Sequence, residues 1–173
     1  NRFIPTLNTY LNYRNHRKMM IIDGNVGYMG GINLADEYIN KKVRFGHWKD
    51  TGIMLRGEGT ANMTSLFLQM WEYVTGETVP PLDAYLPTAK LPPDGYVQSF
   101  ADSPLDDLNI GESIYLQIIH NARDYVYITT PYLVLDNEMI TALTIAAQSG
   151  VDVRILTPGI PDKKLVYMIT RSY

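Results

Sequence analysis

Three residues near the start of the chain have the types and spacing of a site that handles phosphate. His16 and Lys18 are two positions apart, and Asp23 follows Lys18 after four residues. The apolar run 19–22 predicts a strand, and residues i and i+2 of a strand project from the same face. The imidazole and the ammonium would therefore meet one ligand together, the first as a nucleophile and the second as a clamp for an anion. Asp23 is an odd number of residues from Lys18 and belongs to an Asp-Gly turn signal, so we expect it to fix the turn instead.

Further candidates for ligand binding follow this motif. Gly30, Gly31 and Asn33 come directly before residues 33–40, for which we expect a short helix. The first amides of such a helix could receive a phosphate oxygen, although Asn33 fits equally well as the helix N-cap. Tyr132 follows a predicted parallel strand, where α/β sheets place their ligands. Packing against the linker is an equally good interpretation of this tyrosine.

The motif occurs once. His47 and Lys49 repeat the first two positions, but Met54 stands where the acidic residue would be. His120 has no lysine two residues later, and we expect both of these histidines to be structural or surface residues. No group of residues has the spacing of metal ligands, so we expect neither a metal nor another cofactor.

Composition limits the class of protein. The 173 residues are 46% hydrophobic and 19% charged, which is typical of a globular protein, and there is no cysteine. Positive charge gathers around the motif, since residues 1–56 hold nine Lys/Arg against four acids, although the net charge of the chain is −3. This distribution favours an anionic substrate, whereas the acidic remainder argues against a nucleic-acid partner. No apolar run reaches the roughly 18 residues of a membrane-spanning helix.

The elements that must position these residues fall into two groups separated by prolines. Before the prolines we expect a hairpin of two strands, a third strand and a long helix, at residues 18–22, 26–30, 51–55 and 59–75. A proline-rich connection follows, with at most one short strand at residues 96–100. After it, helices and strands alternate in a pattern that predicts a parallel βαβ unit, at residues 110–123, 125–130, 136–149, 151–157 and from 165 onward.

The His-x-Lys-x4-Asp pattern resembles the HKD motif of the phospholipase D superfamily. The wider sequence is similar to bacterial cardiolipin synthases in particular, at residues 12–18, 30–38, 48–51, 130–132 and 146–154. The resemblance implies an α/β fold with a mixed sheet flanked by helices, present here as two partial repeats. Residues 1–79 would be the second half of the first repeat, residues 80–94 a proline-rich linker, and residues 95–173 the first half of the second repeat.

The resemblance also implies an activity. We expect a piece of a longer bacterial membrane enzyme that transfers a phosphatidyl group from one phosphatidylglycerol to another and releases glycerol. His16 would form a phosphohistidine, and the histidine of a second motif, outside this chain, would protonate the leaving alcohol. The piece itself is expected to be soluble and inactive on its own.

Roles for other residues follow from the family as well. An acid downstream of the motif orients the nucleophilic histidine; Asp50 is the candidate, Glu37 the second choice, and a solvated strand-end acid a close alternative. Asn33 would bind phosphate, and Tyr132 would lie near the active site. Two other functions stay open: a single-motif nuclease that pairs two chains as a homodimer, and a non-catalytic module that binds anions.

Overall fold

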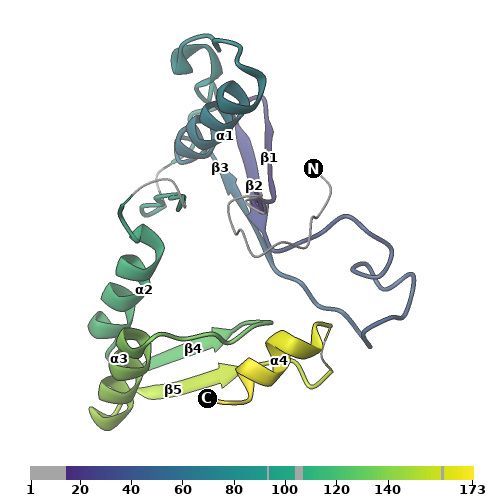
Figure 1. Ribbon diagram of the computed structural model, residues 1–173. Coiled ribbons are helices and arrows are strands. Elements are labelled where there is room, and N and C mark those ends of the chain that lie inside the picture. Colours follow the sequence, from purple (N-terminus) through teal and green to yellow (C-terminus); the bar gives the residue numbers. More distant parts are fainter. Residues whose placement is uncertain (1–14, 93, 104–106, 161) are drawn as a thin grey trace. The chain divides into compact units, whose positions relative to one another are not determined.

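The computed structural model divides the chain into two compact units, each with its own sheet and helices (Figure 1). The first unit takes residues up to 42 and residues 48–106, and the second takes residues 43–47 and 107–173. The structure describes residues 15–92, 94–103, 107–160 and 162–173. The expected mixed α/β class is confirmed, with the antiparallel and the parallel strands in separate sheets.

The sheet of the first unit has three antiparallel strands in the order β1-β2-β3. They are β1 (Met19–Ile22), β2 (Val26–Gly30) and β3 (Gly52–Arg56). In the register of the sheet, Met19 pairs with Met29, which pairs with Ile53. The predicted hairpin and third strand are therefore confirmed.

A tight turn joins β1 to β2. Asp23 and Gly24 have φ angles of 52° and 65°, and the amide of Asn25 donates to the carbonyl of Ile22 at 3.0 Å. Positive φ at both central residues is the hairpin geometry that Asp-Gly sequences favour, because Asp tolerates the left-handed region and Gly adopts it freely. The turn predicted from these residues is confirmed.

One face of this sheet is covered by α1 (Thr60–Thr75). Met63, which is 1% exposed, packs so close to Gly27 that a Cβ there would lie 2.8 Å from its Sδ. The buried hydroxyl of Thr60, at the start of the helix, lies within hydrogen-bonding distance of the carbonyls of Gly24 and Gly57. The helix is thus fixed both to the centre of the sheet and to the hairpin turn.

The proline-rich segment also packs against the hairpin turn. It contains the short 3-10 helix η2 (Leu82–Tyr85). The Asn25 carboxamide oxygen accepts from the amides of Thr88 and Ala89, both at 2.8 Å. This segment is therefore held on the first unit, and the short strand considered at residues 96–100 does not form.

The helix predicted at residues 33–40 is wrong; the segment forms turns. The carbonyl of Asp36 accepts from the amides of Lys41 and Lys42, at 3.0 and 3.2 Å, instead of from the amide four residues on. Asn40 has a left-handed φ of 59°, which a continuing helix does not allow. A segment this short nucleates poorly, and its Asn and Asp side chains compete for the backbone.

The second unit is a βαβ arrangement with additional helices. In chain order it contains α2 (Ile110–Asn121), β4 (Tyr125–Thr129), α3 (Asn137–Gln148), β5 (Asp152–Leu156) and α4 (Lys164–Thr170). β4 and β5 pair in parallel through the α3 crossover, which confirms the predicted βαβ unit.

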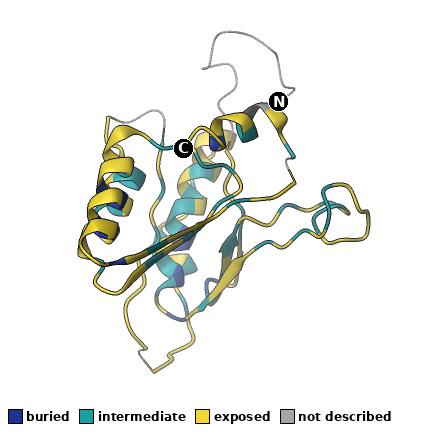
Figure 2. Cartoon of the chain, turned by 90° about the horizontal axis from the view of Figure 1, so that it is seen from below, coloured by how far each residue is buried: buried dark blue, intermediate teal, exposed yellow. Residues whose placement is uncertain are grey.

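The core of the second unit lies between its helices and its sheet. Val126 and Val153 point from the two strands into a buried cluster, and Figure 2 shows buried patches along the helices. The cluster comprises Ile119, Ala142, Leu143, Ala146 and Val151. No helix in the described part of the chain combines the length and apolar character needed to cross a bilayer.

Candidate active site

His16 and Lys18 contact each other directly before β1. The ammonium of Lys18 lies 2.9 Å from Nδ1 of His16 and also donates to the carbonyl oxygen of His16 at 2.7 Å. The ring is exposed and the lysine is half-buried. The two groups thus come together at the surface, as their spacing predicts.

Arg17, between them, and the flanking Asn15 and Met19 face the other way. A groove of about 220 Å³ opens beside α1, and the residues that line it before and in β1 are Asn15, Arg17 and Met19. Because strand residues alternate, His16 and Lys18 belong to the face of the sheet that α1 does not cover. The guanidinium of Arg17 donates to the carbonyl of Asp102 at 3.1 Å, a contact that no sequence pattern predicts.

The contact with Lys18 also determines where the proton of a neutral His16 ring lies. An ammonium has donors only, so Nδ1 must be the acceptor and the ring carries its proton on Nε2. In this arrangement neither ring nitrogen offers a free lone pair. An anion that draws Lys18 away would free the lone pair of Nδ1.

The register of the sheet shows what lies beside this pair. The amide of Gly30 donates to the carbonyl of Lys18, and the amide of Gly31 donates to the carbonyl of Thr51, both at 3.2 Å. Both amides therefore donate to backbone carbonyls on either side of the central strand. They do not begin a helix, because the helix expected after them is absent. The expected anion site at a helix N-terminus is thus not formed. The prediction that Gly31 and Asn33 bind substrate cannot rest on it; Asn33 is half-buried in a loop.

Asp50 lies at the same end of the sheet, just before β3. Its Oδ2 accepts from the indole Nε1 of Trp48 and its Oδ1 from the amide of Thr51, both at 3.2 Å. No described hydrogen bond joins Asp50 to His16. The segments that carry them are separated by the central strand, so they are about 10 Å apart, two strand spacings. The expected role of Asp50 in orienting His16 stays a prediction.

Trp48 is itself held in place. The side chain of Asn40 accepts from the Trp48 amide at 2.6 Å and donates to its carbonyl at 2.7 Å. The ring of Tyr38 packs edge-on against the indole, with centroids 4.9 Å apart. Asp50 therefore rests on a framework built by the loop between β2 and β3. Sequence reasoning missed Asn40 and Tyr38, which it had placed in or beside a helix.

Asp23 occupies the turn at the opposite end of β1 from His16. With a strand rise of about 3.3 Å per residue, the two are roughly 20 Å apart. Its carbonyl accepts from the side chain of Asn25 at 3.0 Å. This placement supports the expected role in fixing the turn.

Tyr132 lies in the second unit, beyond the end of β4. Its hydroxyl donates to Asp162, and the ammonium of Lys163 lies 4.9 Å from the ring centroid. Asp162 and Lys163 follow β5, so the loops after both parallel strands meet here, as the carboxyl edge of an α/β sheet predicts. Sequence reasoning missed these two residues, although their position after β5 could have indicated them.

A second polar group lies across β4 and β5. Arg154 donates to both carboxylate oxygens of Asp152, at 2.8 and 3.0 Å, and the hydroxyl of Tyr127 donates to the same carboxylate at 2.7 Å. The hydrogen bond from Arg154, followed by that from Tyr127, lowers the pKa of the Asp152 carboxyl. The hydrogen bond to Asp152 raises the pKa of the Tyr127 phenol. All three side chains are exposed.

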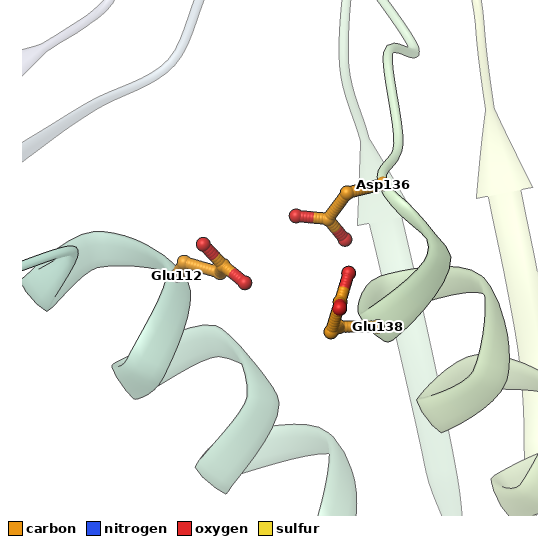
Figure 3. Close-up of side chains that lie close together, drawn as sticks. All are labelled: Glu112, Asp136 and Glu138. Atoms are coloured by element: carbon orange, nitrogen blue, oxygen red, sulfur yellow. The ribbon is translucent and has the colours of Figure 1, made fainter.

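Three carboxylates of the second unit come close together, as Figure 3 shows. Oxygens of Glu112, Asp136 and Glu138 lie within 4.8 Å of one another. Two of the three have structural partners: Asp136 accepts from the amide of Met139 at 2.8 Å as the N-cap of α3, and Glu112 accepts from Asn109 at 3.2 Å. Glu138 lies in the first turn of α3, where a negative charge favours the helix dipole. We therefore assign this group to helix termini.

Comparison with known proteins finds one family. A family model described as "Cardiolipin synthase, PLD-like domain" matches residues 115–173. The chain is 42% identical to a cardiolipin synthase of Alkalihalophilus pseudofirmus over 98% of its own length and 34% of that protein. It is 43% identical to cardiolipin synthase 2 of Bacillus cereus, covering 33% of that protein. An uncharacterized protein of Streptococcus mutans is 52% identical, and the chain covers 37% of it.

No solved structure matches the chain. The chain spans about a third of the length of the curated relatives that it matches. The domain matched over residues 115–173 is phospholipase D-like. The chain is a homologue of bacterial cardiolipin synthases over nearly its whole length.

Proposed function

We propose that the chain carries the nucleophilic half of a phosphatidyltransferase active site. His16 attacks the phosphorus of a phosphatidylglycerol, and Lys18 binds the phosphate oxygens. The single observation that supports this most is the direct contact of the Lys18 ammonium with His16. At this separation, one anion placed between the two groups would engage both of them.

The proposed step forms one bond to phosphorus and breaks another. A bond forms between a ring nitrogen of His16 and phosphorus, the bond from phosphorus to the glycerol oxygen breaks, and glycerol leaves as it is protonated. The whole protein would then transfer the phosphatidyl group to the hydroxyl of a second phosphatidylglycerol. The anionic lipid places this reaction at the surface of a bacterial membrane.

An activated phosphodiester tests the proposal on the chain itself. In bis(4-nitrophenyl) phosphate, the 4-nitrophenolate leaves without a proton, so the missing general acid is not needed. We expect a burst of about one 4-nitrophenolate per chain, because attack by a single histidine forms one covalent adduct. Mass spectrometry should place the aryl phosphate on His16.

Substitutions identify the nucleophile. His16→Asn should abolish the burst, whereas His47→Asn and His120→Asn, at two other exposed histidines, should retain it. An adduct on either of these histidines, or a burst that survives His16→Asn, would contradict the proposal.

A further inference from the structure

We propose that the chain binds the surface of an anionic bilayer through residues 41–49, a basic loop between β2 and β3. This inference goes beyond the proposed function, because it assigns membrane contact to residues that take no part in the transfer of phosphorus. Its test measures binding to vesicles and does not depend on the chemistry of His16.

The basic loop carries a dense positive charge. Its cationic side chains are those of Lys41, Lys42, Arg44 and Lys49, all four are exposed, and the loop contains no acid. Within the described residues, no carboxylate pairs with any of the three lysines. Salt screens charges that are more than about 8–10 Å apart. A surface that touches the loop therefore responds to this local charge more than to the acids elsewhere in the chain.

Hydrogen bonds hold the two ends of the basic loop together. The Asn40 side chain accepts from the amide of Trp48 at 2.6 Å and donates to its carbonyl at 2.7 Å. Lys41 and Lys49 each directly follow one partner of this contact in the chain, and the amides of Lys41 and Lys42 donate to a carbonyl of the preceding turn. The three lysines are thus gathered at the base of the loop by contacts that leave their side chains exposed.

An apolar side chain lies among these cations. Val43 stands between Lys42 and Arg44 and is 80% exposed. At the interface of an anionic bilayer, cationic side chains meet the lipid phosphates while apolar ones enter the boundary between headgroups and acyl chains. A nucleic acid would offer phosphates to the lysines but no apolar layer to Val43. The bilayer is therefore the partner that fits both features.

The basic loop belongs to the connection at the end of the first sheet where His16 and Lys18 precede β1. This connection leaves β2 after Gly30 and enters β3 at Gly52. The amide of Gly30 donates to the carbonyl of Lys18, so the motif and the connection start from neighbouring strands. A bilayer held by the loop would supply lipid headgroups at the end of the sheet that carries the motif.

Co-sedimentation with vesicles measures this binding on the chain as it exists. One set of vesicles contains equal parts of phosphatidylglycerol and phosphatidylcholine, and the other contains phosphatidylcholine alone. The native chain should partition onto the first set and not onto the second. Raising the salt concentration from about 0.1 M to about 1 M should weaken the partitioning, because it shortens the screening length from about 10 Å to about 3 Å.

Two pairs of adjacent lysines provide a variant and a matched control. Lys41→Gln combined with Lys42→Gln should lower the partition coefficient roughly 25-fold, since each cation near an anionic surface contributes about fivefold. The backbone amides of both residues keep their hydrogen bonds in this variant. Lys163→Gln combined with Lys164→Gln removes the same charge from an exposed pair of the second unit and should leave the partition coefficient unchanged.

A label at residue 43 tests insertion while all charges of the loop are kept. The chain has no cysteine, so Val43→Cys provides a single attachment site for the fluorophore nitrobenzoxadiazole. Its emission should shift to shorter wavelength on the phosphatidylglycerol vesicles, because the label enters an apolar layer. The same label on Glu58→Cys, an exposed position beyond the opposite end of β3, should not shift.

Each other outcome decides against the inference. Equal partitioning onto both sets of vesicles would overturn it, and so would native binding by the Lys41 and Lys42 variant or equal weakening by the control pair. Absence of a shift at residue 43 would overturn it as well. Tighter binding to duplex DNA than to vesicles, at equal phosphate and salt concentrations, would make a nucleic acid the partner.

The test also separates this inference from the proposed function. The burst with the soluble diester needs no vesicles, so a chain that shows the burst without binding would contradict the membrane contact alone. A chain that binds without the burst would contradict the proposed function alone.

Discussion

At the scale of single residues, the observed contact of Lys18 and its proposed role exclude each other. Its ammonium contacts Nδ1 of His16 in the ligand-free chain, and the proposed reaction requires it to bind phosphate. Substrate would therefore both occupy the site and release the nucleophile. Asp23, the third residue of the motif, lies in the turn.

Lys18 and Asp23 should respond differently to substitution. Lys18→Met should reduce the rate of the His16 burst by about 10²-fold or more, since it removes the charge that stabilises the phosphate. Asp23→Asn should mainly lower the free energy of unfolding and keep the chemistry. Urea denaturation measures the free energy of unfolding, and stopped-flow absorbance measures the rate of the burst. If a well-folded Asp23→Asn chain lost the burst as completely as His16→Asn, the assignment of Asp23 to the turn would be wrong.

At the scale of elements, the short hairpin turn between β1 and β2 contacts both α1 and the proline-rich segment. Thr60 of α1 contacts its backbone, and Asn25 binds the proline-rich segment. β1, which follows His16 and Lys18, is thereby held from its far end. In the second unit, Asp152 and Arg154 of β5 link to Tyr127 of β4 on the exposed face of the sheet.

The buried Thr60 hydroxyl gives a prediction for this connection. Thr60→Val should lower the free energy of unfolding of the first unit by about 1–3 kcal/mol, because the carbonyl of the buried Gly24 loses this donor, whereas the carbonyl of Gly57 keeps the amide of residue 60. Both tryptophans, Trp48 and Trp71, belong to this unit, so urea denaturation followed by their fluorescence reports on it. Thr75→Val, at the exposed end of the same helix, is the control and should cost less. Equal effects of the two substitutions would contradict the anchoring role.

A pH titration tests the link between β4 and β5. The lowered pKa predicts that Asp152 titrates below the value of about 3.9 of an unperturbed aspartate. The resulting stabilisation is present above the ordinary pKa and is lost as the pH falls through the lowered pKa. Carboxyl carbon shifts measured by NMR give the midpoint, and Arg154→Gln should raise it. A native midpoint at or above the ordinary value would refute the interaction.

At the scale of the whole molecule, the chain contains one complete motif and spans about a third of its curated relatives. The proposed reaction needs two histidines, one to attack and one to protonate the leaving alcohol. In the proposed reaction a second histidine would therefore have to supply this proton.

Phosphatidylglycerol, the proposed natural substrate, should show whether a second histidine is needed. The isolated chain, verified as a monomer by analytical ultracentrifugation, should turn over phosphatidylglycerol at a rate on the order of 10²–10⁴ lower than a two-motif enzyme, because no general acid protonates the glycerol. A cardiolipin synthase of known activity serves as the reference on the same vesicles. Robust transphosphatidylation by the monomer would show that the chain supplies its own acid.

The sequence by itself determined the elements whose signals are local. Each of these signals lies within a short stretch of sequence. They are the Asp-Gly turn, the helical spacing over residues 59–75, and the helix and strand patterns that alternate after residue 110. The same holds for His16 and Lys18, because alternation along a strand fixes their common face.

Only the tertiary structure decided which distant groups pair. The side chain of Asn40 binds the backbone of Trp48, and Asp50 then accepts from the indole; hydrophobic periodicity carries no signal of either contact. Residues 33–40 failed as a helix for the same reason, since Asn40 gains hydrogen bonds from the fold that a short isolated helix does not offer. Polar side chains have several partners within reach, and the path of the chain selects among them.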